Sequence, residues 1–115
     1  MIVKKDDRVK TVRANLKGGQ GDVNIFDLTT EQTIPSHLRL CSEFVLQPNE
    51  SIGTHSHMNE TEIYYIISGE ASILDDGQFK KLYPGDSAIT DGENSHSIIN
   101  DGNDELRFIG IIVLD

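Results

Sequence analysis

Three histidines and one glutamate stand out in this 115-residue chain as side chains whose types and spacing could do chemistry. His55 and His57 are two positions apart, so on a strand both imidazoles project from the same face. Glu62 follows after a short loop, and His96 lies near the start of a later strand. If the Glu62 strand pairs back antiparallel, its carboxylate can face the same interior as the imidazoles. Three imidazoles and one carboxylate then form a mixed nitrogen and oxygen site for a divalent metal ion.

Such a site has open positions. A six-coordinate ion held by four protein ligands keeps two places for water or substrate, which suits catalysis better than a closed structural role. The alternative is a polar strand end at the rim of a barrel, which a lone histidine would favour. Tyr64 and Ile66 share the face of Glu62 on a regular strand. Tyr64 is therefore the candidate catalytic residue, able to orient substrate or donate a proton, although simple packing explains a tyrosine there equally well.

The elements that must position these residues are short strands. From about residue 37 onward, period-2 alternation and β-branched runs are separated by turn signals such as Pro48-Asn49-Glu50 and Asp75-Asp76-Gly77. Turns that recur about every 8–12 residues predict an all-β sandwich or barrel. Only residues 4–17 carry any helical signal, without a firm apolar stripe, and a glycine-rich break at 18–21 follows. No helix pattern follows that break, so a phosphate-binding loop is not predicted.

Three of the four candidate ligands lie in a family motif. Residues 49–69 resemble the first motif of the cupin superfamily, G-x5-H-x-H-x(3–4)-E-x6-G. His55, His57, Glu62 and Gly69 fall at the matching positions. The paired spacings make this resemblance far more specific than H-x-H alone.

The fourth candidate ligand lies in the second motif of the same family. Residues 85–100 resemble G-x5-P-x-G-x2-H-x3-N, with Gly85, His96 and Asn100 in place. Three turn positions depart from the two motifs: Asn49, Asp91 and Glu93 stand where glycine, proline and glycine are expected. Asparagine and aspartate suit turns as well, so the ligand set is unaffected.

The resemblance to small single-domain cupins implies a jelly-roll β-barrel whose ligands point inward. It implies a divalent transition metal, most often manganese, iron, nickel or zinc, at His55, His57, Glu62 and His96. It also implies a homodimer. We expect residues 1–36 to form an N-terminal arm and first strands that take part in the dimer interface, and residues 37–115 to form the barrel.

Composition excludes several classes of partner. The chain has 10 basic and 19 acidic residues, a formal net charge of −9. Such a surface repels phosphate backbones and anionic lipid, so neither nucleic acid nor membrane is an expected partner. The charged first residues lack the apolar segment of a signal peptide, which predicts a cytoplasmic protein. The single cysteine, Cys41, cannot form an internal disulfide.

Two functions follow from these observations. The first is a metalloenzyme acting on a small polar metabolite, with isomerisation, decarboxylation and dioxygenation all compatible. The second is a non-catalytic module that binds a sugar or an organic anion. An enzyme needs an acid or base beside the metal, and the candidates are Tyr64 and, less favourably, Glu43. Arg39 either faces inward to hold a carboxylate or phosphate, or faces outward while Leu38, Leu40 and Phe44 face the core, which is the preferred alternative. His37 matches no motif and is expected to lie in a loop.

Overall fold

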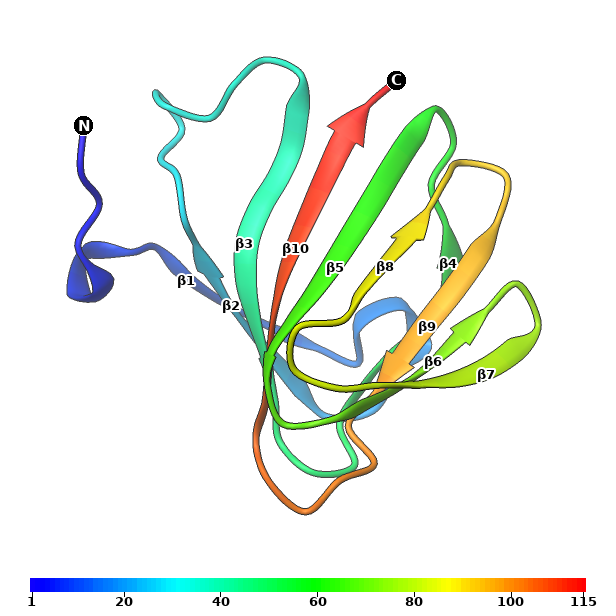
Figure 1. Cartoon of the computed structure of the whole chain (residues 1–115). Helices are drawn as coiled ribbons and strands as arrows, with labels where there is room; N and C mark the ends of the chain where they lie inside the picture. The colour runs from blue at the N-terminus through cyan, green and yellow to red at the C-terminus, as the bar shows by residue number, and fades with distance from the viewer.

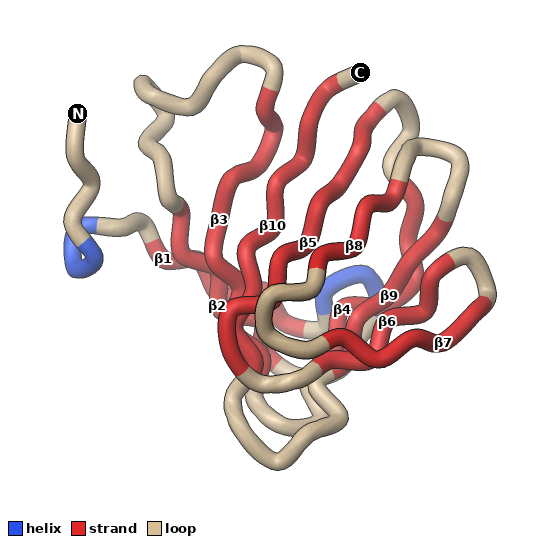
Figure 2. The backbone as a smooth tube through the Cα atoms, in the orientation of Figure 1, coloured by secondary structure: helices blue, strands red, loops and turns tan.

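The computed structural model describes all 115 residues, and almost every regular element is a strand (Figures 1 and 2). The strands are β1 (Lys10–Ala14), β2 (Asp22–Asp27), β3 (Leu38–Leu46), β4 (Ser51–Ser56), β5 (Glu60–Ser68), β6 (Ala71–Asp75), β7 (Gln78–Leu82), β8 (Ser87–Thr90), β9 (Ser95–Ile99) and β10 (Leu106–Leu114). The only helical elements are two 3-10 turns, η1 (Lys5–Asp7) and η2 (Leu16–Gly18). Neither could cross a bilayer.

Two antiparallel sheets fold over one another. The six-stranded sheet has the order β1-β2-β3-β10-β5-β8, and the four-stranded sheet has the order β4-β9-β6-β7. Strands far apart in the chain are therefore neighbours, and Figure 1 shows the C-terminal strand β10 lying between β3 and β5. This is the arrangement of a jelly roll, and it confirms the predicted all-β fold.

The core lies between the inner faces of the two sheets. Its 12 buried residues come from both layers, and the aromatic rings stack within it. Phe44 of β3 and Phe108 of β10 lie with ring centroids 5.1 Å apart, and Tyr64 of β5 meets Phe108 edge to face at 4.9 Å. Phe44 pairs directly with Phe108 in the sheet, so both rings leave the sheet on the same face. The predicted inward direction of Phe44 is confirmed.

The N-terminal segment is strand rather than helix. Where residues 4–17 carry the weak helical signal, the structure has β1 between η1 and η2. β1 is an edge strand whose five residues are all exposed. β2 pairs with β3, and its Val23 and Ile25 are buried in the core. Periodicity was weak here because an exposed edge strand has no buried face to mark it.

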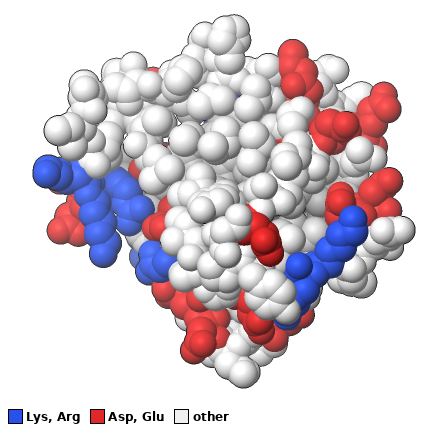
Figure 3. Space-filling model, in the orientation of Figure 1, with Lys and Arg blue, Asp and Glu red and all other residues white.

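The charged side chains are unevenly distributed. In the orientation of Figure 3 the surface over β3, β10 and β5 is largely uncharged, and acidic and basic side chains lie around it.

Candidate metal centre

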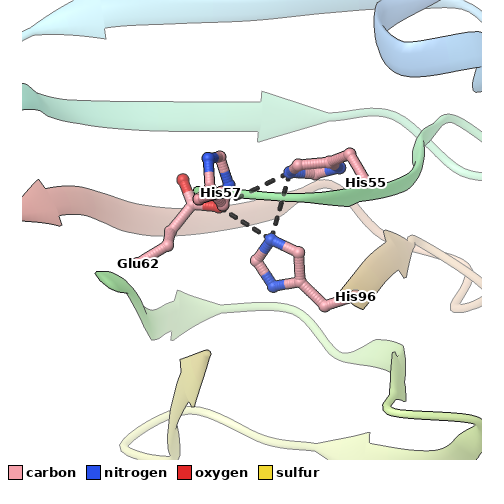
Figure 4. Close-up of side chains that lie close together, drawn as sticks. All are labelled: His55, His57, Glu62 and His96. Carbon is pink, nitrogen blue, oxygen red and sulfur yellow. Dashed lines mark hydrogen bonds and ion pairs between the residues drawn. The ribbon is translucent and has the colours of Figure 1, made fainter. Parts of the chain in front are cut away.

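The four side chains singled out by type and spacing converge inside the barrel. His55 lies on β4, His57 follows the end of β4, Glu62 lies on β5 and His96 on β9. Their candidate ligand atoms all lie within 4.8 Å of one another. Figure 4 shows the three imidazoles and the carboxylate pointing toward a common point. The predicted spatial grouping is therefore present.

The inward-facing atoms are the same on each ring. Glu62 Oε1 lies 2.9 Å from Nε2 of His57, 2.8 Å from Nε2 of His96 and 3.6 Å from Nε2 of His55. The Nε2 atoms of His55 and His96 are 3.0 Å apart. These rings are direct neighbours across the β4–β9 ladder, which fixes their separation.

A β-bulge in β4 decides that the histidines face inward. Ile52 pairs with Ile98 and is buried, but the next pair is His55 with His96, so β4 has one residue more than β9 between these pairs. Strict alternation from Ile52 would turn Thr54 inward and His55 outward. The extra residue shifts the phase, and Thr54 is exposed while His55 lies inside. The bulge therefore creates the site.

Gly53 in this bulge is required by close approach of the N-terminal segment. A Cβ atom there would come within 2.0 Å of the carbonyl oxygen of Lys17, so no side chain fits. The carbonyl oxygen of Gly53 is also the partner of His55 Nδ1. Gly53 thus has two roles. It allows η2 to pack against β4, and its carbonyl oxygen orients the imidazole of His55.

Each imidazole is held through its outer nitrogen. The partners of the three Nδ1 atoms, in chain order, are the carbonyl oxygen of Gly53 at 2.7 Å, a carboxylate oxygen of Glu60 at 3.3 Å and the hydroxyl of Thr90 at 3.0 Å. When Nδ1 carries the proton and donates it to these acceptors, the lone pair of Nε2 faces the centre. Outer partners of this kind orient metal-binding histidines.

The electrostatics of Glu62 favour the ionised carboxylate. Burial by itself would raise its pKa, but the surrounding imidazoles outweigh that effect when they carry positive charge and direct Nε2–H toward the carboxylate. The pKa of Glu62 therefore lies well below its ordinary range, and the group is an anion at neutral pH. Three imidazoles and one buried carboxylate are a donor set that fits a divalent transition metal, which would take the place of the Nε2 protons.

Tyr64 forms one wall of the centre. It is completely buried, and its ring stacks on His96 with centroids 5.0 Å apart and an interplanar angle of 10°. Burial, followed by the charge of Glu62, raises the pKa of the Tyr64 phenol well above its ordinary value. The hydroxyl therefore keeps its proton at neutral pH and is available as a hydrogen-bond donor.

A cavity of about 180 Å³ opens beside the four side chains. Its lining includes two of the imidazoles, Glu62 and Tyr64, several apolar side chains, and three basic residues, Arg13, Lys17 and Arg39. The volume corresponds to roughly six to twelve water molecules. Only a small molecule fits.

Arg39 reaches this cavity because of a second β-bulge. On β3 the pairing with β10 runs from Leu40–Ile112 to Leu38–Val113 and skips Arg39. The bulge lets Arg39 and Leu40 both line the cavity, so the two alternatives for this strand are not exclusive. Arg39 also pairs with Glu60, which lowers the pKa of the Glu60 carboxyl.

The other candidates lie outside the centre. Glu43 is engaged by Arg8 and Arg107 and does not line the cavity. His37 is exposed in the loop before β3, as expected. Asn100 is fully buried and bonds the backbone of Leu46, Asp104 and Gly102, which gives it a structural role.

Four contributors to the centre were not found from the sequence. Glu60 lies three residues after His57 and could have been noticed for that spacing. The other three carry no local sequence signal. Thr90 lies beside the centre because it pairs with Glu62 across the sheet, and the fold places Arg13 and Lys17 in the cavity lining.

Comparison with known proteins agrees with this geometry. A family model described as "Cupin domain" matches residues 42–113. A protein of Thermotoga maritima named "Oxalate-binding protein" is 36% identical over 114 residues, which is 99% of this chain and 94% of that protein.

Solved structures give the same picture. A Thermotoga maritima structure described as "a predicted oxalate decarboxylase" superposes with a TM-score of 0.94 at 36% identity, covering 100% of both chains. A cupin superfamily protein of Desulfitobacterium hafniense has a TM-score of 0.67 at 24% identity, covering 91% of this chain and 84% of that one, and supports the fold alone.

Proposed function

The chain belongs to the cupin family as a small single-domain member, and from that premise we propose that it uses a bound divalent metal to bind a small dicarboxylate anion, with oxalate as the first ligand to test. One observation carries the proposal. A single small cavity contains a buried histidine and glutamate cluster and is also lined by three basic side chains. The names of the Thermotoga relatives supply the choice of oxalate.

Each side chain has a role in this function. His55, His57, Glu62 and His96 would hold manganese, iron, nickel or zinc. When bound, the metal supplies positive charge that attracts anionic oxygen atoms. Tyr64 packs against His96 and keeps its hydroxyl protonated beside Glu62. The apolar lining of the cavity limits competition from water.

Metal binding is tested by elemental analysis of the purified protein. We expect close to one equivalent of a transition metal, and its loss in His57→Ala. Thr54→Ala is the matched control, because Thr54 lies on the same segment but faces solvent. A wild-type protein that stays empty when offered manganese, iron, nickel and zinc contradicts the metal site.

Oxalate binding is tested by calorimetry on the metal-loaded protein, with the metal-free protein as control. We expect binding only in the loaded form. Equal binding with and without metal would contradict the role of the metal in ligand binding. No binding to the metal-loaded form would contradict oxalate as the ligand.

Catalysis on the bound anion is the second candidate, and the buried Tyr64 hydroxyl beside Glu62 favours it. Besides the candidate ligands, Tyr64 and the three basic residues are the groups of the cavity lining that can donate a hydrogen bond to a bound anion. In an assay for formate and carbon dioxide from oxalate, turnover lost in Tyr64→Phe with metal retained would assign an enzyme. Binding without product supports the binding protein.

The proposal includes a homodimer in which the N-terminal segment takes part. Support comes from β1, an edge strand on which Val12 is more than half exposed, and from Val9 just before it, which is also more than half exposed. Exposed edge strands are templates for pairing with another chain. Sedimentation analysis should give a dimer for the wild type and a smaller species for Val12→Lys, and an unchanged mass in the variant would exclude this edge.

A further inference from the structure

The three basic residues of the cavity all come from outside the matched cupin domain. The match begins at residue 42, whereas Arg13 and Lys17 flank the end of β1 and Arg39 sits in the bulge of β3. Every basic residue that lines the cavity therefore belongs to the segment in which the sequence shows no motif. The matched domain contributes the histidines and the glutamate.

Arg13 faces the cavity because of its register. It pairs with Val23 of β2, which is fully buried in the core, and directly paired residues share a face of the sheet. Arg13 thus projects from the inner face at the open edge. Lys17 lies in η2 with a left-handed backbone, φ 55°, and its carbonyl oxygen packs against Gly53 of the bulge. Close contact with β4 places this residue at the cavity.

No acidic side chain compensates the positive charges of Arg13 and Lys17. Neither has a side-chain hydrogen bond or an ion pair, although the chain carries 19 acidic residues. Arg39 differs, because Glu60 already compensates its charge. The cavity thus has two free positive charges at its opening and one carboxylate, Glu62, at its inner end.

The net negative charge of the protein and the apolar lining of the cavity make these two positive charges important for binding a dianion. A net charge of −9 repels a dianion from the surface at long range. Most other cavity-lining residues are apolar and offer no compensation for a second negative charge. A ligand with one carboxylate needs only the metal end, whereas a dianion needs cations at the opening as well.

We propose that Arg13 and Lys17, with Arg39 behind them, form a cationic wall that makes the site selective for dianionic over monoanionic carboxylates. The inference rests on the proposed function and specifies its ligand class. The N-terminal segment thereby becomes part of the binding site, in addition to its proposed place in the dimer.

The test compares two ligands of the same shape on manganese-loaded protein. Oxalate carries two carboxylates, and oxamate replaces one of them with a neutral amide. Each exposed ion pair is worth roughly two- to fivefold in affinity, so Arg13→Gln/Lys17→Gln should bind oxalate about four- to twenty-fivefold more weakly. Oxamate affinity should change less than about twofold, because its amide end does not need the cations.

The matched control is Lys4→Gln/Lys5→Gln, which removes the same charge from exposed residues that do not line the cavity. Metal content is measured for every protein. The wall is supported when only the cavity variant loses its preference for oxalate over oxamate. It is overturned when the cavity variant keeps that preference, loses both ligands equally, or matches the control.

Wild-type protein supplies a readout that needs no variant. Salt screens charge interactions, so oxalate affinity should fall more steeply with ionic strength than oxamate affinity. Equal salt slopes contradict the wall even when a variant fails to fold. If loaded wild type binds neither ligand, the proposed function itself fails and this inference with it, whereas oxalate binding without discrimination overturns the wall alone.

Discussion

Removing the hydroxyl of Thr90 tests whether outer contacts hold the metal ligands in place. Thr90 and His96 are both almost completely buried, and the hydroxyl lies 3.0 Å from His96 Nδ1. Thr90→Val preserves the shape of the side chain but deletes this partner. Water cannot replace the hydroxyl in so buried a position, so the imidazole is left free to rotate or to change tautomer.

The expected magnitude follows from this geometry. Losing an outer-shell partner of a metal ligand lowers metal affinity about 10–100-fold, which corresponds to about 1.4–2.7 kcal/mol. In the metal-free protein the same change leaves the buried Nδ1 unpaired, at a cost of about 1–3 kcal/mol in the free energy of unfolding. The variant should therefore be weakened in both forms, and still folded.

Competition with a chromophoric zinc chelator measures the affinity, and urea unfolding of the metal-free protein measures the stability. Thr61→Val is the matched control, because its hydroxyl bonds Asp115 near the surface and does not contact the cluster. We expect its zinc affinity to stay within about twofold of wild type. A folded Thr90→Val protein with wild-type zinc affinity would refute the role assigned to the outer contacts.

Three further predictions concern the barrel itself. Gly110→Ala places a Cβ 2.7 Å from a ring carbon of Phe44, so overpacking should cost about 1–3 kcal/mol of unfolding free energy in urea; unchanged stability would show that the ring moves freely. Asn100→Ala unpairs the buried carbonyl of Leu46, and calorimetric unfolding should show a loss of about 2–3 kcal/mol; a loss below half of that would argue against its structural role. In metal-free protein, the raised pKa of Tyr64 means that only the unfolded chain loses this proton above pH 10, so stability falls as pH rises, by up to about 1.4 kcal/mol per pH unit. Tyr64→Phe should lack this contribution, and equal slopes for the two proteins would contradict the burial of the phenol.

The ligand set is the part of the site that the sequence predicts best. His55, His57, Glu62 and His96 were identified from residue type and motif spacing, and they meet within one cluster. Their grouping could be predicted because side chains that meet at one point are restricted in their spacing on paired strands. That a metal occupies the cluster is still a prediction.

The direction of the histidines could not be predicted in the same way. H-x-H says that two side chains share a face, but not which face. The bulge between Ile52 and His55 selects the interior, and it exists only through pairing with β9 and packing of Gly53 against η2. A bulge depends on two strands, so one strand's pattern does not reveal it.

By itself the sequence determined which side chains could bind a metal and that the chain is built from short strands, because ligand chemistry and alternation are local properties of residues. The tertiary structure alone decided what surrounds the candidate metal ligands. Arg13 and Lys17 join a cavity with Arg39, and Thr90 supports His96, through strand register and two bulges. These are relations between strands distant in the chain, which emerge only when the sheets fold over one another.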